Sequence, residues 1–194
     1  MVKRLRNLAT ALLVLSWIPS NHGLELSGNF WEFGQATFHV GISGVAPSGS
    51  SWNEAFKRAL DAWSNETAFE FSVVDEFLDP CIDQVGPGGF GDNVTGVNFS
   101  DTVCGSEFRE NVLAVTLTAG LCMDLSCTNF HITDADIVFN NSKNWDIYSG
   151  PLRFDNTTDF ERVALHELGH AIGQRKCRCH HAALRQRNYD PASG

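Results

Sequence analysis

Basic residues are scarce in the main part of this chain. All but one of the 23 aspartates and glutamates, but only 6 of the 14 lysines and arginines, lie between residues 24 and 173. Because this excess of negative charge repels phosphate groups, the composition argues against nucleic acid and anionic membranes as partners. The sequence also lacks repeats and low-complexity tracts, and it has no uncharged stretch long enough to span a bilayer.

The first 23 residues differ from this acidic body. Lys3, Arg4 and Arg6 precede an uncharged, mostly apolar stretch over residues 8–18, and a polar break over residues 19–23 follows. This order is typical of a secretory signal peptide, so we expect residues 1–23 to be a signal and the protein to be secreted to the extracellular space. A buried N-terminal helix is the alternative interpretation.

Secretion permits disulfide bonds, and the chain has six cysteines. Six cysteines allow 15 pairings, and the sequence does not choose among them. Our working prediction pairs Cys81 with Cys104 and Cys122 with Cys127, each pair closing a local loop. In a eukaryotic secretory route the sequence also offers N-glycan acceptors. Five N-x-S/T sequons are present, at Asn65, Asn93, Asn98, Asn140 and Asn156.

Apolar periodicity predicts an α/β fold, that is, a layered α+β arrangement with two main helices. Residues 52–64 have a helical period behind a capping box at residues 51–54, and a second capping box at residues 158–161 opens another helix. The apolar residues of the first helix, Trp52 and Trp63 among them, are expected in the core. Four segments have the two-residue period of strands: residues 37–42, 69–73, 112–117 and 136–139.

Residues 80–111 are rich in glycine, aspartate and asparagine, which predicts an irregular loop. Carboxylates and backbone carbonyls such as those around Asp92 are the ligands that Ca²⁺ prefers, so calcium is a candidate cation for this loop. A plain solvated loop is the simpler interpretation, because no fixed ligand spacing is present.

The most informative segment is the run from His166 to His170, which reads H-E-L-G-H. This is the H-E-x-x-H pattern of helical zinc sites in metallopeptidases. Two histidines four residues apart project from one helix face and can bind one Zn²⁺. Glu167 lies beside the metal without binding it, and as general base it can move a proton from the zinc-activated water to the leaving amine. A merely solvated helix face is the alternative.

Two glycines belong to the same helix. Each of Gly169 and Gly173 costs about 1 kcal/mol of helix stability relative to alanine, so we expect each to have a use. Gly173 is expected to end the helix and turn the chain back toward the metal.

The sequence from Phe160 to Gly173 closely resembles the active-site helix of the matrixin branch of the metzincin zinc endopeptidases. Residues 52–71 resemble the first helix and following strand of that family, and residues 132–140 resemble its strand with an Ala-Asp-Ile core. The resemblance covers most of residues 36–173.

This resemblance implies a twisted, mostly parallel sheet with two helices, and a catalytic domain over residues 24–173 that corresponds to the upper, N-terminal subdomain. It implies His166 and His170 as zinc ligands and Glu167 as the base. It also implies a cleft along an edge strand, where an extended protein or peptide substrate is bound by strand addition and hydrolysed.

Several features of the family are missing. Its third histidine ligand aligns with Lys176, which does not bind zinc at neutral pH. Its methionine turn has no counterpart, because the only methionines are Met1 and Met123. Its cysteine-bearing pro-segment, its lower C-terminal subdomain and its additional structural zinc and calcium motifs are not recognisable either.

Residues 174–194 form a basic tail that is expected to be irregular. We consider two explanations for it. The tail supplies the missing zinc ligand, although no candidate has motif spacing, or the reading frame or exon prediction changes after Gly173 and the peptidase is truncated. The tail residues with suitable ligand chemistry are Cys177, Cys179, His180, His181 and Asp190.

Two functional classes follow. The first is a secreted zinc endopeptidase. The second is a catalytically inactive or truncated peptidase-fold protein that acts as a secreted binding domain. Zinc content separates them. We assign no ligand role to His39 or His131.

Overall fold

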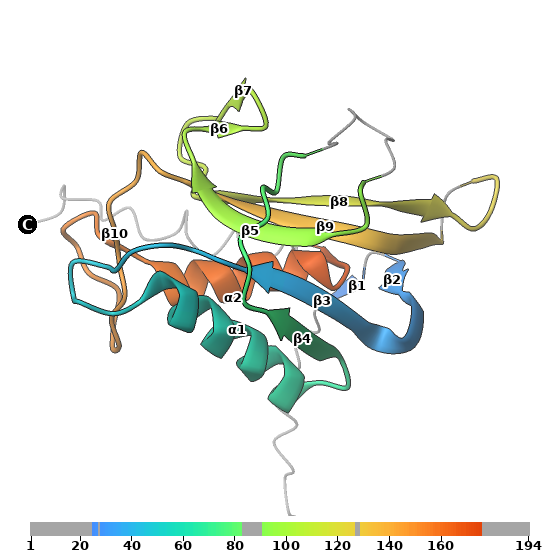
Figure 1. The fold of residues 1–194 in the computed structure, drawn as a ribbon, viewed down its shortest axis with the longest axis horizontal. Coiled ribbons are helices and arrows are strands. Elements are labelled where there is room, and N and C mark those ends of the chain that lie inside the picture. Colours follow the sequence, from blue (N-terminus) through green and yellow to red (C-terminus); the bar gives the residue numbers. More distant parts are fainter. Residues whose placement is uncertain (1–24, 27, 83–90, 127–128, 176–194) are drawn as a thin grey trace, which may run out of the picture.

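The computed structural model describes residues 25–26, 28–82, 91–126 and 129–175. These residues form an α/β fold in which a mostly parallel sheet carries two α-helices on one face (Figure 1). The helices are α1 (Trp52–Glu66) and α2 (Phe160–Ala171), and a 3-10 turn, η1, spans Glu32–Gly34. The strands of the main sheet are β2 (Asn29–Trp31), β3 (Gln35–Val40), β4 (Glu70–Val74), β5 (Thr95–Ser100), β8 (Ala114–Cys122) and β9 (Phe130–Asn140).

The main sheet has the order β2-β9-β5-β3-β4, and these neighbours run parallel to one another. Strand β8 pairs antiparallel with β9 along most of its length and forms an edge of the sheet. Short strands form separate two-stranded pairs: β1 (Glu25–Leu26) with β12 (Gln174–Arg175), β6 (Thr102–Val103) with β7 (Ser106–Glu107), and β10 (Trp145–Asp146) with β11 (Thr158–Asp159).

One core joins both helices to the sheet. Its largest fully buried side chains are aromatic and aliphatic, and they come from strands and helices alike: Phe38, Phe56, Phe139, Phe160, Leu60, Ile132, Ile137 and Leu168. Trp52 and Trp63 pack against this core and are partly buried. The expectation that the apolar residues of the first helix form core is therefore confirmed.

The two helices begin differently. Helix α1 starts at Trp52 as predicted, and its N-cap hydroxyl, Ser51 Oγ, accepts a hydrogen bond from the Glu54 amide at 3.4 Å. The prediction of a second capping box, at residues 158–161, is wrong. The N-cap of α2 is Asp159, and its side chain makes no cap hydrogen bond. Its carboxylate instead lies 3.1 Å from Arg162 Nε and accepts a hydrogen bond from the Tyr148 amide.

All four predicted strands are present, as β3, β4, β8 and β9, with shifted or longer bounds. The prediction of an irregular loop over residues 80–111 is wrong in part, because this segment contains β5, which lies between β3 and β9 in the sheet. Val97 is fully buried there. The strand was missed because glycine and polar residues surround its buried position, whereas interior parallel strands usually have continuous apolar runs.

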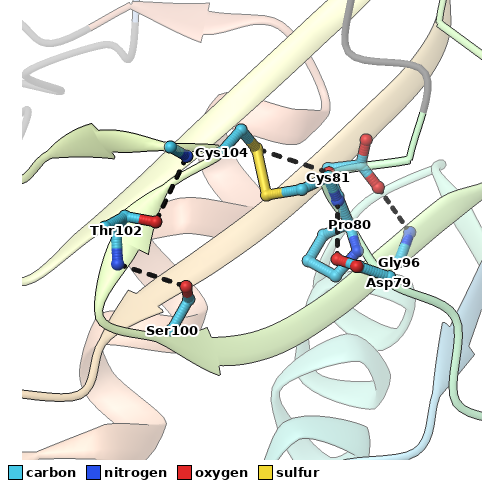
Figure 2. The surroundings of a disulfide bond; sticks show 9 residues. Asp79, Pro80, Cys81, Gly96, Ser100, Thr102 and Cys104 are labelled. Atoms are coloured by element: carbon cyan, nitrogen blue, oxygen red, sulfur yellow. Dashed lines mark hydrogen bonds between the residues drawn. A yellow bond between two sulfur atoms is a disulfide. The ribbon is translucent and has the colours of Figure 1, made fainter.

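The predicted disulfide between Cys81 and Cys104 is confirmed. Figure 2 shows it linking the segment around Asp79 and Pro80 to the turn that follows β6. Cys122 is also disulfide-bonded. Its predicted partner Cys127 lies outside the described residues, so that pairing stays a prediction.

The proposed signal at residues 1–23 and residues 176–194 of the tail also lie outside the described residues. Gln174 and Arg175, the first two tail residues, form β12. Among the described residues, no helix is long and apolar enough to cross a membrane.

Candidate metal centre

Helix α2 carries the three residues of the predicted zinc motif. His166 is exposed, His170 is half-buried, and Glu167 is only 6% exposed. The helix is held firmly because its other face lies in the core, where Ala164 and Leu168 are fully buried. The packing of α2 therefore fixes the direction in which both imidazoles project.

The two imidazoles approach each other through their Nε2 atoms. His166 Nε2 and His170 Nε2 lie 3.2 Å apart, and the ring planes are nearly perpendicular, at 89°. Because Zn–N bonds are about 2.0–2.1 Å long, one ion can contact both nitrogens at this separation. The pair therefore fits two ligands of a single zinc ion.

A backbone carbonyl orients the His170 ring. His170 Nδ1 lies 3.0 Å from the carbonyl oxygen of Gln174. Since a carbonyl can only accept a hydrogen bond, this contact favours the neutral tautomer in which Nδ1 carries the proton and Nε2 keeps its lone pair. This is the tautomer that a histidine needs in order to bind a metal through Nε2.

The turn after α2 places Gln174 against this ring. Gly173 has a φ of 90°, and a Cβ added there would lie 2.4 Å from the Asn29 carbonyl oxygen. Glycine is therefore required twice, by conformation and by space. Beside it, Trp31 Nε1 donates a hydrogen bond of 2.8 Å to the Ala171 carbonyl, which satisfies one of the last carbonyls of the helix. The predicted turn at Gly173 is confirmed.

Gly169 lets the two helices approach closely. A Cβ at this position would lie 3.3 Å from Trp63 Cζ2 and 3.1 Å from Gln174 Oε1. The indole of Trp63 is held in place by its hydrogen bond of 2.9 Å to the Leu165 carbonyl. The use expected for this helical glycine is thus contact with α1.

The Glu167 carboxylate contacts the edge strand β8. Thr116 Oγ1 lies 2.7 Å from Glu167 Oε2 and 3.1 Å from the Glu167 backbone carbonyl. The hydroxyl has one proton to donate. The carboxylate oxygen is both the nearer and the stronger acceptor, so the hydroxyl donates to Glu167 Oε2. This donor offsets part of the cost of burying the Glu167 carboxylate.

Of the predicted zinc ligands, His166 and His170 lie in the described residues, and no third candidate lies beside them there. Within the described part of the chain, no group of three or more His, Cys, Asp or Glu side chains is arranged to hold a metal ion. Lys176, at the position of the family's third histidine, lies outside that part. So do the tail candidates: Cys177, Cys179, His180, His181 and Asp190.

The other two histidines of the body have strand environments. His131 Nε2 accepts a hydrogen bond of 3.2 Å from the Glu32 amide, and its ring stacks on Phe30. His39 Nδ1 lies 3.8 Å from the Glu76 carboxylate. These contacts tie both histidines to residues outside the zinc motif.

The loop predicted to bind calcium passes over a buried carboxylate of the sheet, that of Asp134. Asp134 of β9 is fully buried, and among the described residues neither carboxylate oxygen has a hydrogen-bond partner. The backbone of Gly91 passes over it so closely that a Cβ there would lie 1.9 Å from Asp134 Oδ2. Burial raises the pKa of the Asp134 carboxyl to about 6, and the negative charge of Asp92 adds to the shift. Ca²⁺ takes six to eight oxygen ligands, so these two carboxylates alone do not make a calcium site, and the calcium stays a prediction.

Sequence reasoning missed Trp31, Thr116 and Gln174 as neighbours of the motif. Nothing in the sequence identifies them, because each reaches the motif through tertiary packing or through its backbone.

No known protein-family model matches this chain, and no curated protein matches it.

Proposed function

We propose that this protein is a secreted zinc-dependent endopeptidase of the matrixin type, in which His166 and His170 hold the zinc ion and Glu167 is the general base. Its described residues would correspond to the upper, N-terminal subdomain of a metzincin catalytic domain, without the lower C-terminal subdomain. The single observation that carries the proposal is the pair of Nε2 atoms 3.2 Å apart beside a buried glutamate.

The hydrogen bond of the His170 ring supports this assignment. The Gln174 carbonyl favours the His170 tautomer that leaves Nε2 unprotonated. When bound, zinc would polarise the scissile carbonyl and lower the pKa of the attacking water. Glu167, one residue after the first ligand, would take the proton of that water and later give it to the leaving amine.

The edge strand supports a peptide substrate. In the described part of the chain β8 pairs with β9 alone, so the other side of β8 has backbone groups that an extended peptide can pair with. The same strand carries Thr116, which contacts Glu167. A peptide that pairs with β8 would therefore lie next to the general base.

An extracellular location is part of the same proposal. The disulfide between Cys81 and Cys104 supports it, because disulfides persist in oxidising compartments and are rare in the cytosol.

The experiment combines zinc analysis with a cleavage assay. The purified chain is assayed for bound zinc and for cleavage of an unfolded protein substrate, beside Glu167→Ala and the exposed control Glu110→Ala. We expect close to one zinc per chain in all three, because Glu167 is not a ligand. Cleavage should fall about 100-fold or more in Glu167→Ala only. Zinc near zero with no cleavage would contradict the proposal.

One observation favours a second candidate, the catalytically inactive secreted binding domain. The third ligand is absent among the described residues, and each missing ligand lowers zinc affinity and loosens its orientation. Substoichiometric zinc in a well-folded, protease-resistant chain would support this alternative. Aggregated or protease-sensitive material would instead indicate a truncated product.

A further inference from the structure

We infer that Thr116 of β8 is a positioning residue for the Glu167 carboxylate, an inference that rests on the proposed peptidase function. Thr116 lies 51 residues before Glu167 in the sequence and on a different element, yet its hydroxyl is 2.7 Å from Glu167 Oε2. Nothing in the zinc motif requires a threonine at this place in the sheet.

The contact restricts how the carboxylate can turn. Thr116 Oγ1 touches both the side chain and the backbone carbonyl of Glu167, at 2.7 and 3.1 Å. Threonine is branched at Cβ and has few side-chain rotamers, so its hydroxyl is itself well placed. With Oε2 engaged by this donor, Oε1 is the oxygen left to accept a proton from water.

Burial makes this hydroxyl matter. Glu167 is 6% exposed, so solvent cannot easily replace a lost donor. Without the hydroxyl, the carboxylate would lose the contact that selects one rotamer. A general base must lie within hydrogen-bond reach of the proton that it takes, and small displacements of reacting groups are costly.

The position of Thr116 also links substrate to base. The strand that would receive an extended peptide is the strand that holds the carboxylate. Glu167 is therefore set by the element that the substrate would contact, in addition to the helix that carries it.

The test compares two substitutions that differ in one group. Thr116→Val replaces the hydroxyl with a methyl group of similar size, and Thr116→Ser keeps the hydroxyl and removes the methyl. The control is Thr37→Val, the same change at an exposed position of β3. The thermal midpoint of each variant is measured first, so that kinetic effects are compared among folded proteins.

In the zinc-loaded protein we expect Thr116→Val to lower kcat about 10- to 100-fold with KM within about twofold of wild type. Thr116→Ser should recover most of kcat, and Thr37→Val should match wild type. Bound zinc should be equal in all four proteins, because Thr116 contacts no ligand. A purely structural role would lower the thermal midpoint without a difference in kcat between the valine and serine variants.

A second measurement does not depend on activity. Side-chain ¹³C relaxation on the metal-free chain should show a less ordered Glu167 side chain in Thr116→Val than in wild type or Thr116→Ser. Equal order and equal kcat in the valine and serine variants would overturn the inference while leaving the peptidase proposal intact. Loss of order in Thr116→Val, with a wild-type chain that cleaves nothing, would uphold the positioning contact and contradict the proposed function instead.

Discussion

Gly173 lies against the backbone of Asn29, so closely that a Cβ on Gly173 would come within 2.4 Å of the Asn29 carbonyl oxygen. The contact joins the end of α2 to β2 and sets the turn that carries the Gln174 carbonyl to His170. Gly173→Ala should therefore destabilise the fold by about 2–4 kcal/mol, the sum of left-handed backbone strain and a steric clash. Urea unfolding measures this change, and zinc affinity should fall with it.

Gly49→Ala is the matched control for that variant. Gly49 has a φ of 84°, and a Cβ there would meet nothing within 4 Å. Only the backbone strain remains, so the loss should be about 1–2 kcal/mol. Equal losses in the two variants would show that the contact with Asn29 has no energetic effect.

Asp134 should make the metal-free chain less stable at neutral pH than in acid. Its pKa of about 6 in the folded state exceeds the unfolded value of 3.8, so the folded protein binds the proton more tightly. Stability from this group is fully present below pH 3.8 and is lost as the pH rises through 6. Asp134→Asn should thus stabilise the chain in EDTA at pH 7.5 by about 2–3 kcal/mol, and have little effect near pH 4. Urea unfolding at both pH values is the measurement, and a variant less stable than wild type at pH 7.5 would count against it.

Bound calcium should offset the loss of folding stability that the ionised Asp134 carboxylate causes at neutral pH. A cation bound by the Asp134 and Asp92 carboxylates would favour their ionised forms and stabilise the folded state in proportion to its binding. We expect millimolar Ca²⁺ to raise the thermal midpoint of the wild type by several degrees at pH 7.5 and to leave Asp134→Asn unchanged. Mg²⁺ is the control, because it demands a tighter octahedral site. An equal rise in the variant would place the effect elsewhere.

The disulfide between Cys81 and Cys104 should contribute about 3 kcal/mol to stability. Its sequence separation is 23 residues, and a cross-link of this span removes much of the freedom of the unfolded chain. The double variant Cys81→Ser with Cys104→Ser leaves no unpaired thiol from this pair. Its urea midpoint should fall accordingly. An unchanged midpoint would mean that the disulfide does not stabilise the folded state relative to the unfolded chain.

Asn140 should carry no glycan in the folded, secreted protein. It is 3% exposed, its Nδ2 donates a hydrogen bond of 2.9 Å to the Val112 carbonyl, and its Oδ1 accepts from Ser142. A sugar on Nδ2 would force this side chain out of the structure. Glycopeptide mass spectrometry should find occupancy only at exposed sequons such as Asn65, Asn93 and Asn156. Substantial occupancy at Asn140 would contradict the burial described here.

Local signals predicted much of the fold. The period of residues 52–64 gave α1 because its apolar face is continuous, and the H-E-x-x-H spacing put two histidines on one face of α2. Strand β5 was missed because its one fully buried side chain, Val97, is flanked by glycine and asparagine. Pairing with β3 and β9 makes it a strand, and that information is not local.

The neighbours of the motif were beyond sequence reasoning for a related reason. Gly173 signals a turn by itself, but the Gln174 group that contacts His170 is a backbone carbonyl, which every residue possesses. Thr116 looks like any strand threonine until β8 is packed against α2. The predicted capping box at residues 158–161 failed because Thr158, which would be its N-cap, pairs with Trp145 in β11, and the N-cap of α2 is the next residue, Asp159.

The hydrogen bond from Trp31 to the Ala171 carbonyl joins residues 140 positions apart. A ribosome releases the chain from its N-terminus, so β2 leaves the exit tunnel long before the helix end that it must meet. Closing so long a loop is slow, because the chain loses conformational entropy before the stabilising contacts form. The contact that satisfies this carbonyl at the end of α2 can therefore form only when nearly all of the described chain has been made.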